Sequence, residues 1–464
     1  MRAVPLMLVA AFTAATLATA TPAQSQTTLS PFQRGVPYGT LTTESIKLTA
    51  LDAINRALEH NLGVLTATES ISQAEGARLL AKAGLMPDIN GHVSETRQVL
   101  NLAAFGFPLP DGIPSIVGPF NVFDARVGVS MPILDLHASN DLKAARHNLE
   151  AAKYSYKSAR ELVVLVAADA YLRTMAADAR AVSAHTQVET AQALLTQATD
   201  LKTAGLVAGI DVLRADVQLS TQKQRATAAQ NEFEKTKLGL ARLIGLPVGQ
   251  NFTLVDELPD APIPDIPLEE ALDRAYKARP DYQAALERLH AAESARAAIS
   301  GELLPSVHVN ADYGDLGLSI PDSHYTYTLT GLLSIPIFNA GKTKGRAVQA
   351  DAELRNRRSE VEDMKSGIYY DIRTAFFDLQ ANGEQLEVAT HGKDLAATTL
   401  VQARDRFSAG VTNNIEVIQA QEALALANDQ YILALYTYNV SKAALARGLG
   451  DAEEATRKYL GGTR

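Results

Sequence analysis

The chain has 464 residues and a net charge of −9, contains no cysteine or tryptophan, and is only 6% aromatic. The lack of cysteine excludes disulfides, thiol nucleophiles, cysteine-based metal sites and an acylated cysteine. Because the net charge is negative, the composition gives no sign of the basic surface that nucleic-acid-binding proteins use, and we do not expect nucleic acid as a partner. Alanine is abundant in the middle of the chain, which favours long, closely packed helices over globular domains with bulky cores.

The N-terminus has the features of a secretory leader. Arg2 precedes an apolar stretch from about Val4 to Leu17, and small residues follow where a signal peptidase could cut. We therefore predict a signal peptide over residues 1–23, with a buried first helix as the alternative. Residues 24–47 then form an N-terminal extended segment.

The rest of the chain is duplicated. Arg56 aligns with Arg274, and Pro87 with Pro305, at one constant offset and without a gap. The first repeat has an extra loop rich in proline and glycine between its predicted strands. The predicted segments are a first repeat at 48–246, a proline-rich linker at 247–267, a second repeat at 268–450 and a C-terminal tail at 451–464.

Each repeat is predicted to contain a helix, two strands and a long helical hairpin. The hairpins are expected at 136–246 and 340–450. In the first, apolar residues recur every seven positions, as in a coiled-coil seam: Leu142, Leu149, Tyr156, Val163 and Ala170. This series, uninterrupted by proline, predicts one helix from about Leu136 to Thr203, which would be roughly 100 Å long. Each long helix then ends at a glycine-bearing turn.

The strand segments alternate between apolar and polar residues. They are predicted at about 88–99, 120–134, 306–317 and 323–338. In the last, Tyr325, Tyr327 and Leu329 share one face, while the intervening threonines share the other. This alternation is typical of an outer-membrane barrel strand, although it also fits an edge hairpin half buried on a soluble core. Four strands cannot close a barrel, whereas three chains would supply about twelve, so closure predicts a homotrimer.

Two turn sequences occupy the same place in the two repeats. They are GLVAGIDVLRA, from Gly205 to Ala215, and FSAGVTNNIEVIQA, from Phe407 to Ala420. Together with the duplicated halves, they resemble the TolC family of outer membrane efflux proteins over nearly all of the mature chain. The resemblance implies a mainly α fold with a β-barrel part: duplicated helical hairpins form an α-barrel tunnel, and four strands per chain form a twelve-stranded barrel in a homotrimer.

The resemblance also implies location, function and partners. The protein would lie in the outer membrane, contact its lipid and extend into the periplasm. It would passively conduct substrates received from a periplasmic adaptor (membrane fusion) protein and an inner-membrane pump, in efflux or type I secretion. The alternative is a non-channel periplasmic coiled-coil structural or adaptor protein. Adaptors, however, carry a single hairpin, whereas this chain has two.

No chemistry is expected of the chain itself. Its nine histidines form no HExxH or HxxxH pattern, and the sequence has no nucleophile elbow and no phosphate-binding glycine loop. We therefore predict no enzymatic activity, no catalytic residues, no metal ligands and no cofactor.

The hairpin tips are the predicted functional site. Gly205 and Gly410 stand where a helix must reverse, a role that C-capping alone also explains. The resemblance implies adaptor docking at the tips, for which the candidates are Leu206, Val207, Phe407 and Val411. Packing against a neighbouring tip is the alternative for the exposed apolar side chains.

Two carboxylates are predicted to line the aperture. Asp211 and Glu416 occupy equivalent repeat positions, so three-fold symmetry would place three copies of each around a narrow opening. A solvated helix face is the alternative. Where the family often carries an arginine and a second aspartate, this chain has Thr412 and Gln419, and Phe407 replaces a frequent tyrosine. These departures predict a weaker or differently wired gate.

Overall fold

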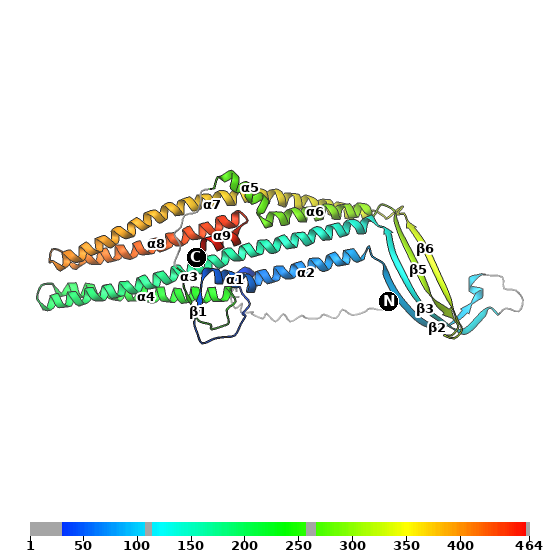
Figure 1. The fold of residues 1–464 in the computed structure, drawn as a ribbon, viewed down its shortest axis with the longest axis horizontal. Coiled ribbons are helices and arrows are strands. Elements are labelled where there is room, and N and C mark those ends of the chain that lie inside the picture. The colour runs from blue at the N-terminus through cyan, green and yellow to red at the C-terminus, as the bar shows by residue number, and fades with distance from the viewer. Residues whose placement is uncertain (1–29, 107–113, 257–265, 461–464) are drawn as a thin grey trace, which may run out of the picture.

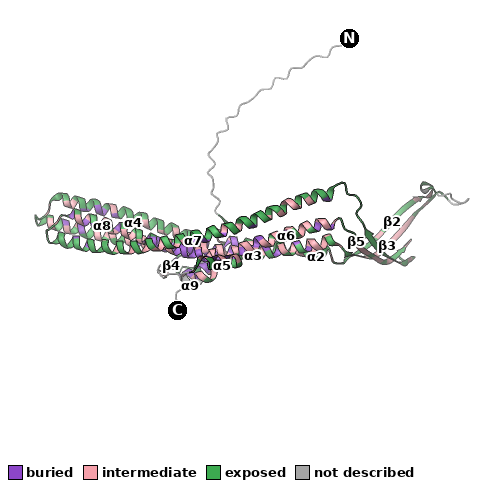
Figure 2. Cartoon of the chain, turned by 90° about the horizontal axis from the view of Figure 1, so that it is seen from above, coloured by how far each residue is buried: buried purple, intermediate pink, exposed green. Residues whose placement is uncertain are grey.

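The structure is a computed structural model that describes residues 30–106, 114–256 and 266–460. The molecule is elongated, with helices along most of its length and a four-stranded sheet at one end (Figure 1). The predicted signal peptide lies outside the described residues, as do parts of the predicted extended segment, linker and tail. Figure 2 shows buried residues along the inside of the helical part, with exposed residues on its outer faces.

The two repeats have the same order of elements. Those of the first repeat are α1 (Ala50–His60), α2 (Leu62–Ala83), β2 (Asp88–Asn101), β3 (Ile116–Leu134), α3 (Leu136–Thr203) and α4 (Gly209–Leu243). Those of the second are α5 (Leu268–Ala278), α6 (Pro280–Gly301), β5 (Ser306–Gly317), β6 (Ser323–Ser334), α7 (Lys342–Ser408) and α8 (Asn414–Gly448). The long helices α3 and α7 therefore each lead into a shorter return helix.

Some short elements were not anticipated from the sequence. Strand β1 (Ile46–Leu48) lies at the boundary between the predicted extended segment and the predicted first repeat, and it pairs in parallel with β4 (Phe252–Leu254) in the predicted linker. Helix α9 (Ala452–Leu460) occupies most of the predicted tail. Short 3-10 helices, η1 (Pro31–Gln33) and η2 (Leu102–Phe105), complete the described elements.

The last strand ends earlier than predicted. Strand β6 stops at Ser334 instead of continuing to about residue 338. Pro336 lacks a backbone N–H for strand pairing, which accounts for the early end. The side chains of Ile337 and Phe338 beyond it are almost fully exposed.

The four-stranded sheet has one apolar and one polar face. Its order is β2-β3-β5-β6, and every neighbouring pair is antiparallel. The register aligns Val127, Tyr313 and Tyr327 across three strands, and these side chains are all exposed. Further exposed apolar residues on this face are Ile89, Val93 and Leu329.

The opposite face carries a polar network. The Arg126 guanidinium donates to both carboxylate oxygens of Asp124, at 2.6 and 2.7 Å, and contacts Asp312 on β5 at 3.4 Å. The Ser130 hydroxyl donates to the Asn310 side-chain oxygen at 2.7 Å. The two faces thus differ in the way expected for a sheet that separates lipid from an aqueous interior.

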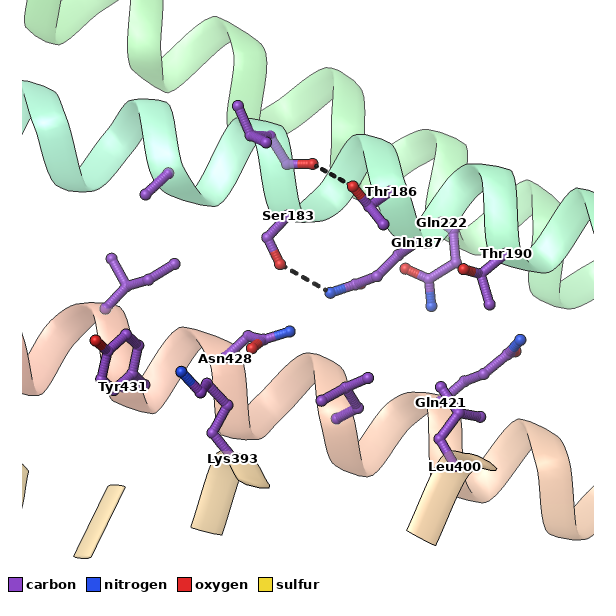
Figure 3. Close-up of a pocket in the computed structure, with 14 residues that line it drawn as sticks. Ser183, Thr186, Gln187, Thr190, Gln222, Lys393, Leu400, Gln421, Asn428 and Tyr431 are labelled. Atoms are coloured by element: carbon purple, nitrogen blue, oxygen red, sulfur yellow. Dashed lines mark hydrogen bonds between the residues drawn. The ribbon is translucent and has the colours of Figure 1, made fainter. Parts of the chain in front are cut away.

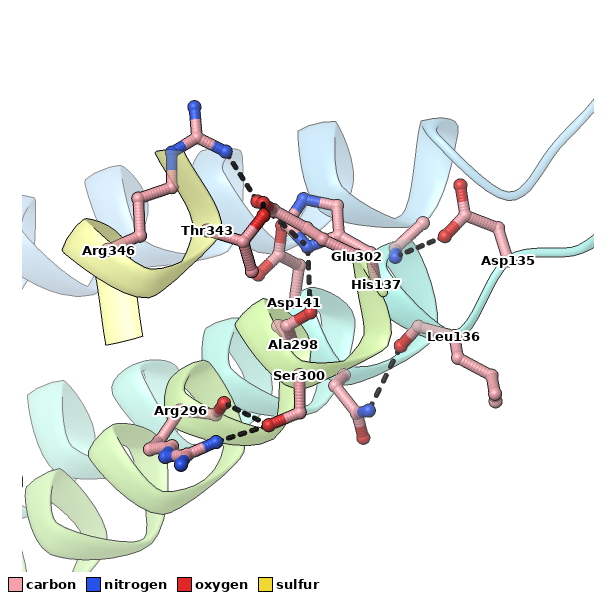
Figure 4. Close-up of polar contacts among 12 residues, drawn as sticks. Asp135, Leu136, His137, Asp141, Arg296, Ala298, Ser300, Glu302, Thr343 and Arg346 are labelled. Atoms are coloured by element: carbon pink, nitrogen blue, oxygen red, sulfur yellow. Dashed lines mark hydrogen bonds and ion pairs between the residues drawn. The ribbon is translucent and has the colours of Figure 1, made fainter. Parts of the chain in front are cut away.

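Polar side chains fix the junction between the sheet and the helices (Figure 4). Asp135 caps α3 by accepting from the Ala138 backbone N–H at 2.9 Å. The His137 ring nitrogen Nδ1 lies 3.1 Å from the Ala298 carbonyl oxygen of α6. Glu302, which follows α6, accepts from the Thr343 hydroxyl of α7 at 3.2 Å and pairs with Arg346. Helices from both repeats therefore meet where the strands begin.

The largest buried cluster lies near the middle of the helical part, and Tyr171 of α3 is fully buried in it. The Tyr171 hydroxyl lies 3.0 Å from both the Leu48 carbonyl and the Asp256 carboxylate. The same Asp256 oxygen accepts from the Ala50 backbone N–H at 2.7 Å. Burial and the nearby Asp256 raise the pKa of Tyr171. Tyr171 thus connects α3 to β1 and to the residue that lies shortly after β4.

A half-buried carboxylate of α3, Glu161, predicts a pH dependence of stability. Burial, and then the charge of Asp281, raises the pKa of Glu161 to about 7. Because the folded state holds this proton more tightly than the unfolded chain does, stability falls as the pH rises from about 4.3, the ordinary glutamate pKa, to about 7. Glu161→Gln should therefore raise the unfolding temperature at pH 8 but not at pH 4.5.

Thermal unfolding of the purified protein at the two pH values measures this difference. Glu362→Gln, which removes an exposed carboxylate from α7, controls for the loss of one negative charge. An equal gain at both pH values would contradict the explanation that the ionised form of Glu161 destabilises the folded state.

Candidate functional site at the hairpin tips

The first hairpin reverses at a glycine in the left-handed conformation. Gly205 has a φ of +74°. The Leu206 N–H donates to the Leu201 carbonyl at 2.8 Å, and the Gly205 N–H donates to the Lys202 carbonyl at 2.9 Å. This pair of bonds is the Schellman motif, which satisfies carbonyls at the end of a helix. A residue with a Cβ would be strained at this position.

The second hairpin repeats this geometry. Gly410 has a φ of +71°, and the Val411 N–H donates to the Arg406 carbonyl at 2.9 Å. The Gly410 N–H donates to the Phe407 carbonyl at 3.0 Å. Helix α8 then begins at Asn414, and the Asn413 side chain accepts from the Ile415 N–H at 3.1 Å. Both predicted turn glycines therefore make the same structure.

The residue after each turn glycine exposes an apolar side chain. Leu206 is 72% exposed and Val411 is 67% exposed, whereas Val207 is half-buried. Exposed apolar side chains gathered at one end of a molecule are typical of a protein contact site.

Phe407 differs from this prediction because its side chain is only 4% exposed. It packs in a small core to which α3, α4, α7 and α8 all contribute. The other buried members of this core are Leu194, Ala198, Ala215, Leu400, Ala403, Val417 and Ala420. The expectation that the Phe407 side chain docks a partner is therefore wrong for the described chain, and this residue instead holds the two hairpins together.

Asp211 and Glu416 lie in the first turns of α4 and α8. Asp211 is paired with Arg214, whose NH1 nitrogen lies 3.3 Å from an Asp211 carboxylate oxygen. Glu416 is paired with Arg406, whose Nε lies 3.1 Å from Oε1 of Glu416. Each carboxylate thus has a basic partner on its own hairpin, and the described contacts do not join the two carboxylates to each other.

Thr412 and Gln419, two of the three residues that depart from the pattern of the family that the sequence resembles, differ in their contacts. The Thr412 hydroxyl donates to Oε2 of Glu416 at 2.6 Å, so this carboxylate is held by both a cation and a hydroxyl. Gln419 is exposed and lies on α8. At the tip of the second hairpin, an ion pair with Arg406 and a hydrogen bond from Thr412 therefore hold the Glu416 carboxylate in place.

A residue that the sequence analysis missed joins the tips of the two hairpins. Asn414 is fully buried, and its side-chain nitrogen donates to the Asp211 carbonyl at 2.7 Å. Its side-chain oxygen is also buried and has no hydrogen-bond partner among the described residues. The signal available in the sequence was an asparagine pair at a helix start, which indicates capping but does not identify a partner some 200 residues away.

A second connection lies farther from the tips. The Glu422 carboxylate of α8 accepts from Gln218 at 2.7 Å, Gln222 at 2.9 Å and Arg225 at 2.7 Å, all on α4. Burial acts to raise the pKa of Glu422, but the bonds from Gln218 and Arg225 outweigh it and leave the pKa below its ordinary value. Glu422 thus stays ionised and links the return helices of the two repeats.

A cavity of about 690 Å³ lies between the long hairpins (Figure 3). Polar side chains from all four helices reach it, including Ser183, Gln187, Gln222, Gln421 and Asn428. No histidine or carboxylate is present in its described lining. Its described lining therefore offers hydrogen-bonding groups and one cation, Lys393, whose Nζ lies 4.0 Å from the centroid of the Tyr431 ring.

No helix in the part of the chain that the structure describes is both long and apolar enough to cross a membrane.

The sequence matches a family of known proteins along both repeats. The family is described as outer membrane efflux protein, and its model matches residues 53–246 and 271–451. The pyoverdine export outer membrane protein OpmQ of Pseudomonas putida is 26% identical over 421 residues, which cover 89% of this chain and 87% of that protein. The outer membrane protein TolC of Escherichia coli is 22% identical, over 72% of this chain and 70% of that protein.

The structural comparison agrees with the sequence match. The CmeC outer membrane channel of Campylobacter jejuni superposes with a TM-score of 0.77 at 17% identity, covering 92% of this chain and 94% of that one. This likeness shows the fold of duplicated helical hairpins with a small sheet. Because the family match spans most of the chain, the protein belongs to the outer membrane efflux protein family.

Proposed function

We propose that three copies of this outer membrane efflux channel form a homotrimer, in which their sheets join edge to edge in the membrane. In the described chain, β2 and β6 are the outer strands of the sheet, so each has one edge that is free to pair. Four strands from each of three chains give about twelve, within the range of known barrels. The hairpins then continue as a tunnel through the periplasm.

The observation that carries this proposal is the difference between the two faces of the sheet. Tyr327 and Leu329 lie on an exposed apolar face, whereas Arg126, Asp124 and Asp312 form a network on the other. Closing the sheet with the apolar face outward would place tyrosine and leucine against outer-membrane lipid and the charged network in the channel. A sheet buried on a soluble core would not need an apolar face in solvent.

The protein is an outer membrane efflux channel and not an enzyme, as its family indicates. The alternative of a non-channel periplasmic coiled-coil or adaptor protein is set aside, because the match to this family covers both repeats. Membership of efflux and secretion systems implies partner proteins. We infer a periplasmic adaptor that docks on Leu206, Val207 and Val411, and an inner-membrane pump that supplies the energy.

The names of the relatives refer to chemically different transported substances. They include pyoverdine export, toluene efflux and alkaline protease secretion. We infer that one fold serves all of these cargoes, and that the adaptor and pump, more than the channel, select what this protein conducts.

We further propose that Asp211 and Glu416 line the aperture at the tips. Three copies of each carboxylate around a constriction would favour cations over anions. Each carboxylate is held by an arginine of its own hairpin, so the ring would be partly neutralised and its orientation fixed. The buried Asn414 contact supports the idea that the two helix starts in each chain move together.

The test is the ion selectivity of the purified channel in planar bilayers. The double variant Asp211→Asn with Glu416→Gln should lower the ratio of potassium to chloride permeability severalfold, measured as the reversal potential in a salt gradient. Glu69→Gln, which removes an exposed carboxylate from α2, is the matched control and should keep the original ratio.

Detergent-corrected light scattering of the same samples should give the mass of three chains. A monomer would contradict the homotrimer. A correctly assembled double variant with unchanged selectivity would contradict the aperture assignment alone.

A further inference from the structure

We propose that His147, Glu287 and His290 form a binding site for a divalent transition-metal ion of the zinc class between α3 and α6. Each residue offers one ligand atom, and these atoms all lie within 4.8 Å of one another. His147 belongs to the first repeat, whereas Glu287 and His290 belong to the second. The site is separate from the hairpin tips and does not depend on their proposed role.

The carboxylate lies between the two imidazoles. Nδ1 of His147 is 2.7 Å from Oε2 of Glu287, and Nδ1 of His290 is 3.7 Å from Oε1 of the same carboxylate. The two imidazole rings have centroids 5.4 Å apart and are tilted by 55°. The two nitrogens therefore approach the two oxygens of one carboxylate, which gathers three possible ligand groups around one point.

The three ligand atoms are close to the spacing of a zinc site, but do not yet have it. Zinc binds imidazole nitrogen and carboxylate oxygen at about 2.0–2.2 Å, which in a tetrahedral site places ligand atoms about 3.3 Å from each other. Since the ligand atoms all lie within 4.8 Å of one another, the farthest pair must approach by at most about 1.5 Å, while His147 and Glu287, now 2.7 Å apart, must separate by about 0.6 Å. Rotation of these three side chains can supply this movement while both helices keep their places.

The chemistry of the three groups selects the kind of ion. Imidazole together with carboxylate suits zinc, nickel and copper, whereas magnesium and calcium prefer oxygen ligands alone. Three protein ligands leave one position for water, and all three side chains are partly exposed, so an ion can enter from solvent. The neighbouring Arg288 is directed away, since it donates to the Ser155 hydroxyl at 2.7 Å.

The sequence pattern of this site explains why it was missed. Glu287 and His290 are three residues apart, so they share one face of α6, but the third ligand lies on another helix 140 residues away from Glu287. Helices α3 and α6 pack side by side over much of α6 (Figure 1). A bound ion would therefore cross-link the two repeats between the middle of the molecule and the sheet.

Zinc titration of the full-length protein tests the site. The purified detergent-solubilised protein is first treated with a chelator, and zinc chloride is then added in a calorimeter. We expect saturable binding of one ion per chain in the micromolar range. The variants His147→Gln and His290→Gln should each weaken this binding at least tenfold. His391→Gln, at an exposed histidine on α7, is the matched control and should bind as the original protein does.

Two further readouts distinguish a metal site from a simple histidine–glutamate pair. Cobalt should give the visible absorption of a four-coordinate ion in the original protein and lose it in His147→Gln. Zinc should also raise the unfolding temperature of the original protein but not that of His290→Gln. The proposal is overturned if zinc binding is not saturable, or if the two variants bind zinc as tightly as His391→Gln does.

Discussion

Replacing Tyr171 by alanine is expected to lower the free energy of unfolding by about 3–5 kcal/mol, as for other large aromatic residues removed from a core. The ring is fully buried in the cluster near the middle of the molecule. Its removal leaves a cavity and also withdraws the hydroxyl from the Leu48 carbonyl and the Asp256 carboxylate. The N-terminal segment and β4 should then detach from α3 at lower temperature or denaturant concentration.

Tyr171→Phe separates the two contributions. This variant keeps the ring and loses only the hydrogen bond of the hydroxyl, which is expected to cost about 0.5–1.5 kcal/mol. Both acceptors keep another donor, because the Asp256 oxygen still accepts from the Ala50 N–H and the Leu48 carbonyl from the Val255 N–H. Tyr370→Ala removes an exposed tyrosine from α7 and serves as the surface control. Unfolding curves of the solubilised protein provide the comparison. A Tyr171→Ala variant as stable as Tyr370→Ala would show that this cluster does not hold the fold.

Leu329→Arg is expected to prevent most of the protein from assembling in the outer membrane. Leu329 is 73% exposed on the apolar face of β6, opposite Ala311 of β5. An arginine facing lipid at the middle of a bilayer costs about 2–4 kcal/mol in barrel proteins, and a homotrimer would incur this cost three times. The measurement is the amount of assembled protein in the outer-membrane fraction.

The adjacent residue provides a matched control. Thr328 lies on the polar face and is paired in register with Asp312. An arginine at position 328 would face the polar side and could pair with that carboxylate, so Thr328→Arg should assemble at nearly the original level. If Thr328→Arg failed and Leu329→Arg assembled, the two faces of the sheet would have been assigned the wrong way round.

The features predicted correctly from the sequence are those that repeat along one element. The seven-residue spacing of Leu142, Leu149 and Val163 reflects one continuous seam, and the predicted helix has the same bounds as α3. The alternation of apolar and polar residues in β6 likewise follows from the two opposite faces of a strand. Such periodic patterns need no knowledge of distant partners.

The features that were missed depend on distant parts of the chain. Strands β1 and β4 have three residues each and exist because Leu48 and Phe252 are buried together, although they lie in different segments. Asn414 and Glu422 act through partners on α4, in the other repeat. Phe407 could have been placed correctly, because Leu400, Ala403 and Phe407 share one helix face; its place in a tip motif obscured that signal.

The free edges of the sheet also bear on how the protein is made. Within the described chain, β2 and β6 each leave a row of backbone groups unpaired, beside an apolar face. If the proposed homotrimer forms, a newly made chain would therefore be exposed to aggregation and proteolysis until its edges meet those of other copies. If three chains must meet, the rate of assembly should rise steeply with the supply of chains.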